Sequence, residues 1–254
     1  MNQLALEVEP KVVVWFSCGA ASAVAASITL MTYPNARIVN NPVAEEDPDN
    51  RRFLKDVEKW LGVTIESATN MRYPDGRCVD VWDDRRFMSG VRGAPCTLEL
   101  KKEARRQWET KNQPDWHVLG FTVDEQSRYE RFVENERENT LPILINAGLT
   151  KQDCFDIIKD AGIELPYAYR AGLPNANCIA CVKATSPTYW NHVRKVWPEA
   201  FKQRAEQSRD IGAKLVRVKN ERIFLDELDP EAKGRPMKKM QIDCGIFCEK
   251  EEDE

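Results

Sequence analysis

Short apolar runs alternate with longer amphipathic stretches along the first two thirds of the chain. The run Val12–Phe16 is β-branched and aromatic, which predicts a buried strand, and the small-residue stretch 20–30 after it predicts a helix that packs closely on a sheet. Further strands are predicted at 37–40, 63–65, 117–120 and 141–145, and further helices at 50–61, 98–108, 124–136 and 150–161. This alternation is typical of a parallel sheet with crossover helices.

The alternation of strands and helices becomes less regular after Pro166. This change predicts a boundary between two parts of the chain. Helices are predicted at 187–197 and 199–209, a hairpin at 216–225, and a long functional loop region at 69–95. We therefore predict an α/β fold with a mainly parallel, five-stranded-type sheet, helices on both faces and a small C-terminal lobe that carries cysteines. The predicted domains are an α/β domain at 11–165, a helical, cysteine-rich lobe at 166–248 and an acidic, disordered tail at 249–254.

Charge and composition limit the partners and the cellular compartment that we expect for this protein. The net charge is −4 over 254 residues, and residues 249–254 alone carry five acids and one lysine, so the rest of the chain is neutral and any nucleic-acid surface must be a local patch. No apolar run reaches the roughly 20 residues that a membrane span needs. Eight cysteines, with no secretory pattern at the N-terminus, indicate a cytoplasmic protein whose thiols stay reduced.

Two close cysteine pairs, far apart in the sequence, indicate a metal site. Cys178 and Cys181 form a Cys-x-x-Cys pair, Cys244 and Cys248 form a Cys-x-x-x-Cys pair near the end, and Cys96 is a further candidate ligand. Thiolates are soft donors, so an iron–sulfur cluster or zinc is expected rather than magnesium or calcium. The isolated cysteines are expected to be buried and chemically idle: Cys18, Cys78 and Cys154.

The turn after the first strand is the first candidate binding site. It reads Ser17-Cys18-Gly19-Ala20-Ala21-Ser22, and small residues there leave backbone N–H groups open to an anion at a helix N-terminus. The carboxyl edge of a parallel sheet is also where ligands bind. The turn therefore indicates either a phosphate site or simply close packing of a helix on the sheet.

A second candidate follows the strand that ends at Gly120. Glu125 and Arg128 lie three apart on the predicted helix, and the arginine fork suits phosphate or sulfate oxygens, although a surface ion pair is the simpler interpretation. Lys101 is similarly ambiguous. The arginines near Cys96 favour either solvated loop charge or contact with a polyanion: Arg85, Arg86, Arg92, Arg105 and Arg106. His117, inside a predicted strand, is expected to be a hydrogen-bonded core residue.

Taken together, these segments resemble the phosphoadenosine phosphosulfate (PAPS) reductase family, within the adenine-nucleotide α-hydrolase-like, PP-loop superfamily. Residues 17–22 are similar to the PP-loop pattern Ser-Gly-Gly-x-Asp-Ser, and residues 96–101 resemble the family's cysteine–lysine segment. Residues 120–128 resemble its Gly-x-x-x-x-Glu-Ser-x-x-Arg segment, and the family's second half is matched in order over 141–181, through Lys151, Tyr169 and Gly172. The resemblance covers roughly residues 11–205.

The resemblance implies roles for individual residues. The implied nucleotide-binding residues are Ser17, Cys18, Gly19, Ala20, Ser22, Glu125 and Arg128. The implied catalytic residues are Lys101, Arg128 and Cys244, which stands in a segment similar to the family's Glu-Cys-Gly-Leu/Ile-His. The metal ligands are expected among Cys96, Cys178, Cys181, Cys244 and Cys248. Two departures from the pattern stand out: Cys18 replaces a glycine, and Ala21 stands where ATP-cleaving members have aspartate.

These roles leave alternatives open. If Cys244 is free, it is the nucleophile of a sulfonucleotide reductase that releases sulfite and is reset by a thiol reductant such as a thioredoxin. If both close pairs bind the metal, no tail nucleophile remains, and the alternatives are an ATP-dependent sulfurtransferase (thiolase) acting on nucleic acid or a non-catalytic nucleotide-binding protein. The expected cofactor is a [4Fe–4S] cluster, or alternatively Zn²⁺, beside an adenine nucleotide or sulfonucleotide that is substrate or ligand.

Overall fold

The computed structural model describes residues 9–90 and 93–237, and a five-stranded parallel sheet is at its centre. The strands run in the order β3-β2-β1-β4-β5, and every pair of neighbours is parallel. Their bounds are β1 Val12–Phe16, β2 Arg37–Asn40, β3 Glu66–Ser67, β4 Trp116–Val118 and β5 Thr140–Leu141. The predicted fold class, a parallel α/β sheet, is confirmed.

Helices cover both faces of the sheet because β1 alternates its side chains between two cores. Val12, Val14 and Phe16 pack with α1, α2 and α8, whereas Val13 and Trp15 pack with residues of α5 and α6. The bounds of these helices are α1 Ala20–Thr32, α2 Asp49–Leu61, α5 Ala104–Asn112, α6 Gln126–Asn135 and α8 Lys151–Asp160. Thr150 caps α8 as predicted: its side chain accepts from the Asp153 N–H, and Asp153 accepts in return.

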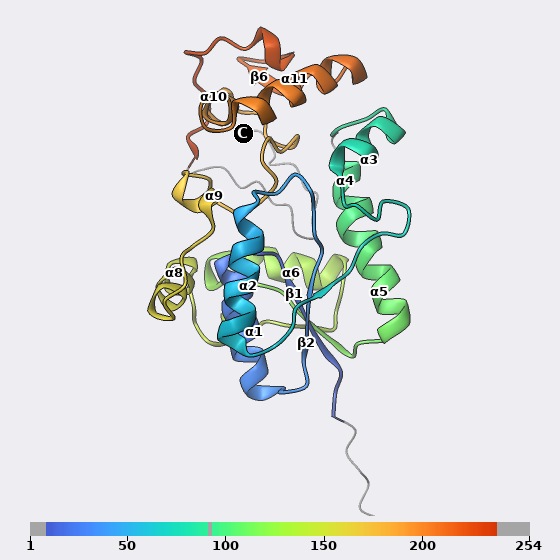
Figure 1. Ribbon diagram of the computed structural model, residues 1–254, viewed down its shortest axis with the longest axis vertical. Helices are drawn as coiled ribbons and strands as arrows, with labels where there is room; N and C mark the ends of the chain where they lie inside the picture. Colours follow the sequence, from blue (N-terminus) through green and yellow to red (C-terminus); the bar gives the residue numbers. More distant parts are fainter. Residues whose placement is uncertain (1–8, 91–92, 238–254) are drawn as a thin grey trace, which may run out of the picture.

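The C-terminal elements lie beyond the carboxyl edge of the sheet, with α10 and α11 at the top of Figure 1 and α9 below them. They are α9 Tyr167–Arg170, α10 Pro187–Val196 and α11 Pro198–Ile211, followed by the hairpin β6 Val216–Val218 and β7 Glu221–Ile223 and the short helix η3 Leu225–Glu227. The hairpin was predicted and is confirmed. The domain boundary at 165/166 stays a prediction, and the tail at 249–254 lies outside the described residues.

Three sequence predictions were wrong in detail. The region 69–95, expected to be a loop, contains the helix α3 Cys78–Arg85 and the start of α4 Pro95–Thr97. The run 141–145 was expected to be a strand, but Pro142, which cannot donate to a strand ladder, ends β5, and α7 Ile143–Asn146 follows. The third strand lies at Glu66–Ser67 rather than at 63–65.

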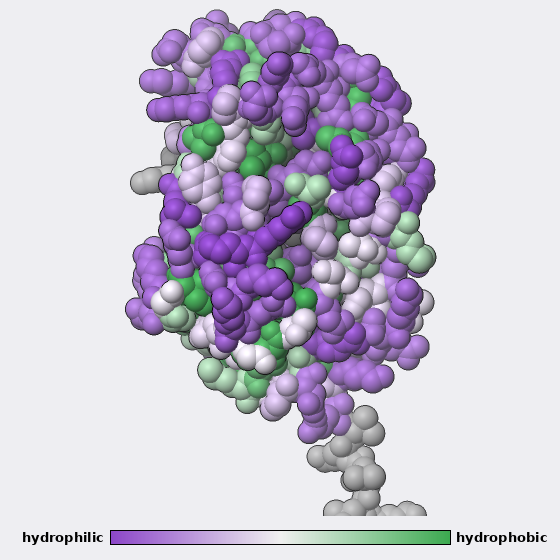
Figure 2. Space-filling view, viewed as in Figure 1, coloured by the Kyte–Doolittle hydropathy of each residue, from purple (hydrophilic) through white to green (hydrophobic). Residues whose placement is uncertain are grey.

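The remaining elements connect these parts. A π-helical segment, η1 Leu98–Glu103, joins α4 to α5, and a short 3₁₀ turn, η2 Val123–Glu125, precedes α6. The face shown in Figure 2 is mostly hydrophilic, with scattered apolar residues. None of the helices in the described parts of the chain is both long and apolar enough to cross a membrane.

Candidate functional site

The turn between β1 and α1 presents a helix N-terminus that has neither a side-chain cap from its N-cap residue nor an acid in its first turn. Gly19 is the N-cap residue and supplies no side-chain hydrogen bond, and the first turn of α1 contains no acid. The Ser22 hydroxyl instead ties the turn together, because it donates to the Gly19 carbonyl at 2.8 Å and accepts from the Ser17 N–H at 3.1 Å. The positive end of α1 therefore remains available to an anion.

Two close approaches fix the position of this turn. A Cβ on Gly120 would lie 2.8 Å from the Ser22 nitrogen, so the chain after β4 can pass the start of α1 only with glycine at this position. A Cβ on Gly19 would lie 3.0 Å from the Tyr169 hydroxyl. That hydroxyl is hydrogen-bonded to the backbone of Ala20 and Ala176, and burial raises its pKa to about 12. The turn is thus held between β4 and α9.

The turn opens into a cavity with a strongly cationic lining. Ser17, Gly19, Ala21 and Ser22 form one wall. Four cations and one carboxylate also line the cavity: Lys101, Arg105, Arg128, Lys151 and Glu125. An excess of cations beside a helix N-terminus suits a polyanionic ligand, since phosphate and sulfate oxygens accept hydrogen bonds from both.

Each of the four cations in the cavity is positioned by a partner, and for Arg105 this partner is the Asn41 side chain, whose Oδ1 accepts from its Nε at 3.0 Å. Lys101 is buried and lies 3.3 Å from the Glu46 carboxylate. Arg128 pairs with Glu125 at 2.5 Å, three residues before it on the chain. The Lys151 ammonium donates to the Pro174 carbonyl and to the Asn175 side chain, both at 2.7 Å. These contacts hold the positive charges in place before any ligand arrives.

Most of the residues predicted to bind a nucleotide line this one cavity. They are Ser17, Gly19, Ser22, Glu125 and Arg128, and Lys101, which was predicted to be catalytic, lines it as well. Cys18 and Ala20 are buried and do not belong to the lining. Cys18 has a φ of 56° in the left-handed region that glycine adopts freely, at the position where the resembled motif has glycine. Sequence reasoning assigned no role to Lys151 and Tyr169, although both stand in the segments of the family resemblance.

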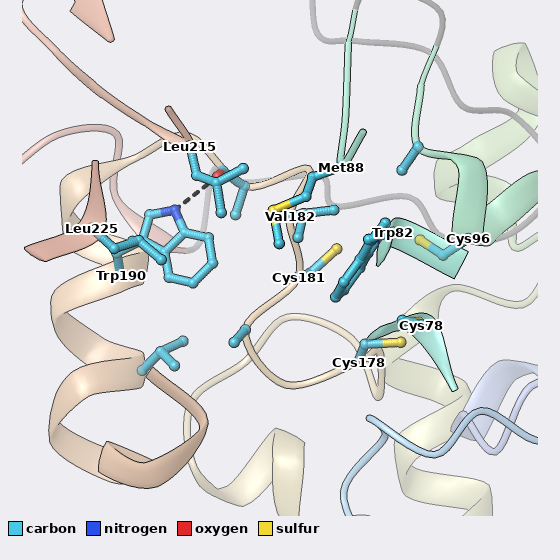
Figure 3. Packing of buried hydrophobic residues seen from close by; sticks show 14 of the residues in the cluster. Cys78, Trp82, Met88, Cys96, Cys178, Cys181, Val182, Trp190, Leu215 and Leu225 are labelled. Atoms are coloured by element: carbon cyan, nitrogen blue, oxygen red, sulfur yellow. Dashed lines mark hydrogen bonds between the residues drawn. The ribbon is translucent and has the colours of Figure 1, made fainter. Parts of the chain in front are cut away.

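Four buried cysteines lie in one core cluster with α3, α10 and α11: Cys78, Cys96, Cys178 and Cys181. Figure 3 shows them drawn around the indole of Trp82. Cys78 makes hydrogen-bond contacts with Cys178 and with Cys96, and these contacts, together with burial, raise the pKa of the Cys78 thiol. Cys78 is buried as expected, but it is not isolated in the fold, because α3 places it against the other cysteines.

The loop Glu45–Glu46 holds the cysteine segments together. The Glu45 carboxylate accepts from the backbone N–H groups of Cys78 and Val79, at 2.7 and 3.2 Å, and so caps α3. The Glu45 carbonyl accepts from the Ile179 N–H at 2.9 Å, and Glu46 forms a β-bridge with Cys178. Two acids of the connection between β2 and α2 therefore attach α3 to the Cys-x-x-Cys segment.

The cysteine cluster provides donors suited to a soft metal, although they are not arranged around an ion. Across residues 9–90 and 93–237, no group of three or more Cys, His, Asp or Glu side chains is placed to hold a metal ion. The donor chemistry nevertheless fits zinc or an iron–sulfur cluster, because several sulfurs meet in a buried, apolar site. Cys244 and Cys248, the other predicted ligands, lie outside the described residues.

The other cysteines and the arginines near Cys96 have separate environments. Burial raises the pKa of Cys18 above its usual range and that of Cys154 to about 12, as expected of idle thiols. Three of the arginines form ion pairs: Arg85 with Glu99, Arg86 with Asp210 and Arg106 with Glu103. Arg105 lines the cavity, and Arg92 lies outside the described residues. Pairing of three of the five favours solvated loop charge over a nucleic-acid patch at those positions.

Comparison of the sequence with protein-family models and with curated proteins finds no match. Among solved structures, the chain is similar to the U34-tRNA thiolase NcsA from Methanococcus maripaludis with its [4Fe–4S] cluster. The identity is 12%, the alignment covers 83% of this chain and 70% of that one, and the TM-score is 0.43.

Proposed function

We propose that the protein binds the anionic end of an adenine nucleotide in the cavity at the β1–α1 turn and performs sulfur chemistry at the neighbouring cysteines. The observation that carries this proposal is the cavity itself. A helix N-terminus with no acid in its first turn and four cations converge there at the carboxyl edge of a parallel sheet. This is the combination that binds nucleotide phosphates in open α/β folds.

The cavity and the cysteine cluster are neighbours through two connections. Asn175 and Asn177 line the cavity, and Cys178 follows directly in the chain. Glu46 pairs with Lys101, whose side chain lines the cavity, and bridges to Cys178 through its backbone. A nucleotide whose phosphates contact Lys101 would therefore lie close to the sulfur-bearing loop.

The burial of the cysteines favours sulfur transfer over sulfonucleotide reduction as the finer function. A reductase needs an accessible thiolate as its nucleophile. All six cysteines in the described residues are buried, so such a nucleophile would have to be the tail residue Cys244, with a thioredoxin-type reductant to reset it. Sulfur transfer from a thiolate-held centre to a nucleotide-activated nucleic acid does not need this tail thiol.

Individual residues take the following parts in the proposal. The N–H groups of the turn and Lys101, Arg128 and Lys151 hold the phosphates and offset their charge. Glu125 is the carboxylate that lines the cavity. Ala21, in the same lining, stands where ATP-cleaving members of the resembled superfamily have aspartate. A [4Fe–4S] cluster, or alternatively zinc, would be held by Cys96, Cys178 and Cys181 and would supply soft-metal sulfur chemistry when bound.

Calorimetric titration with ATP tests the nucleotide site, and the adjacent lysines Lys101 and Lys102 provide a matched pair of variants. Lys101 lines the cavity, whereas Lys102 forms an ion pair with Glu136. A charge-assisted hydrogen bond is worth about 1.5–3 kcal/mol, so Lys101→Met should weaken ATP binding roughly 10- to 100-fold. Lys102→Met should bind as the unaltered protein does. Equal affinity in both variants, with both folded by circular dichroism, would refute the proposed site.

Product analysis then separates the two finer functions. With inorganic sulfide supplied as the sulfur source, sulfur transfer predicts ATP turnover that nucleic acid stimulates, and incorporation of sulfur into that nucleic acid, detected by mass spectrometry. Reduction predicts sulfite release from PAPS or adenylyl sulfate, abolished by Cys244→Ser. Sulfite release that depends on Cys244 would overturn the preference for sulfur transfer.

A further inference from the structure

Arg204 on α11 is a buried cation whose environment requires negative charge nearby. Its side chain is 4% exposed, and the guanidinium carbon lies 4.0 Å from the ring centroid of Trp82. One terminal nitrogen donates to Gln207, but the buried Nε has no hydrogen-bond partner. A buried, incompletely paired guanidinium is expensive, because the group loses its hydration without full compensation.

The groups that favour the charged form of Arg204 are mostly the clustered cysteines. Burial lowers the pKa of Arg204, and the groups that act in the opposite direction are Cys78, Glu45, Cys178 and Cys96. Glu45 supplies part of the negative charge, but its carboxylate already accepts from two backbone N–H groups at the start of α3. Neutral thiols supply no net charge, whereas metal-bound thiolates supply a strong one.

Cys78 occupies the middle position among these sulfurs. It is the first residue of α3 and contacts both Cys178 and Cys96. The turn of α3 that follows carries Trp82, on which Arg204 lies. One short helix therefore supplies both a central thiol and the surface that positions the buried cation.

We propose that Cys78 is a ligand of the thiolate metal centre and that Arg204 is the buried counter-charge of that centre. The inference rests on the proposed function, which places a soft metal at Cys96, Cys178 and Cys181. Metal binding would release the thiol protons to solvent and would leave the sulfurs as thiolates. Arg204 then faces a net negative group, which offsets the cost of its burial.

Metal analysis of the full chain, purified anaerobically, tests the role of Cys78. Iron, labile sulfide and zinc are measured in the unaltered protein, in Cys78→Ser and in Cys154→Ser. Cys154 is a matched control because it is buried in α8 with the sheet core and outside the cysteine cluster. Cys78→Ser should retain at least tenfold less metal after dialysis against a chelator, and Cys154→Ser should match the unaltered protein. If Cys78→Ser does not fold, Cys78→Ala replaces it and has the same expected result.

The outcomes separate this inference from the proposed function. Iron with labile sulfide, or zinc without it, both support the centre when Cys78 is required. Full metal content in a folded Cys78 variant overturns this inference but leaves the thiolate centre. A lack of iron and zinc in the unaltered protein overturns the thiolate centre and this inference together, while ATP binding in the titration above would still stand.

Chelator kinetics test the role of Arg204. Replacement of an outer-shell partner typically weakens metal binding 10- to 100-fold, so Arg204→Gln should release its metal about tenfold faster or more. Arg204→Lys keeps the charge and should release the metal more slowly than Arg204→Gln. If the glutamine variant is folded and releases the metal at the unaltered rate, Arg204 is not the counter-charge.

Discussion

The cavity at the β1–α1 turn and the cysteine cluster are neighbours built by different means. The cavity is formed by backbone at the ends of β1 and β4, where glycines and a helix N-terminus leave polar groups available. The cysteine cluster is formed by side chains from α3, α4 and the 178–181 loop, packed around the indole of Trp82 in an apolar core. The cavity can therefore exchange a ligand readily, whereas the cluster can only exchange one by local opening of its core.

The different construction of the two regions suits them to two different ligands. A polyanionic substrate must enter and leave, so it suits a preformed backbone cradle with cations held by Glu46, Glu125 and Asn175. A soft metal must be retained, so it suits buried sulfurs with a buried cation close by. The loop Glu45–Glu46 touches both regions and couples their positions.

The largest expected effect is on the packing of the cysteine cluster. Trp82 is 2% exposed, whereas Trp116 at the start of β4 is 38% exposed. Trp82→Ala should lower the free energy of unfolding by about 3–5 kcal/mol, because it leaves a cavity and removes the surface under Arg204. Trp116→Ala should change it by about 0.5 kcal/mol or less. Urea unfolding measures both, and similar losses would contradict the central position of Trp82.

The next effect separates the geometry of the cavity from general stability. Gly120→Val adds a side chain where a Cβ lies 2.8 Å from the Ser22 nitrogen, so it should weaken ATP binding roughly tenfold and cost about 1–3 kcal/mol of stability. Gly148 has a φ of 68° and open space around its Cα. Gly148→Ala should therefore cost about 1 kcal/mol through backbone strain and leave ATP binding unchanged. Equal losses of affinity would show that stability, not geometry, controls binding.

A smaller effect concerns the sheet beneath the cavity. His117 in β4 is 2% exposed and accepts from the Trp15 Nε1–H at 3.1 Å. Burial, with Arg137 and Arg105 nearby, lowers the pKa of His117 to about 3. Below its usual pKa near 6.5 the unfolded chain binds a proton that the folded chain excludes, so stability should fall by about 1.4 kcal/mol per pH unit as the pH decreases towards 4. His117→Gln should reduce this slope, and an unchanged slope would contradict the assignment.

The fold was largely predictable from sequence because its signals are local. The apolar run Val12–Phe16, the Thr150 cap and the alternation of strands with helices each depend on neighbouring residues. The helix α3 was missed because it has only eight residues and so shows no long periodic pattern. Its apolar residues are buried in the same core as residues of α11, which are distant in the sequence. Pro142 marked the end of β5, but the apolar residues after it resembled a continuing strand.

The candidate site was predictable to the extent that its residues belong to one turn or one motif. Ser17, Gly19 and Ser22 follow each other closely, and the Cys-x-x-Cys spacing marks Cys178 and Cys181. Cys78 and Arg204 belong to no turn or spacing motif that could be recognised in the sequence. They join the cluster only through tertiary packing, more than 120 residues apart in the sequence, which single-sequence spacing does not reveal.

Hydrogen exchange with and without ATP tests the central claim, that the nucleotide cavity and the sulfur-bearing loop form one functional region. The account predicts that ATP slows exchange at residues 17–22 and at 175–181 together, since Asn175 and Asn177 line the same cavity as the turn. Protection should be lost in both segments in Lys101→Met and kept in Lys102→Met. If ATP protects neither segment, or protects residues 17–22 while 175–181 exchange at an unchanged rate, the claim is contradicted.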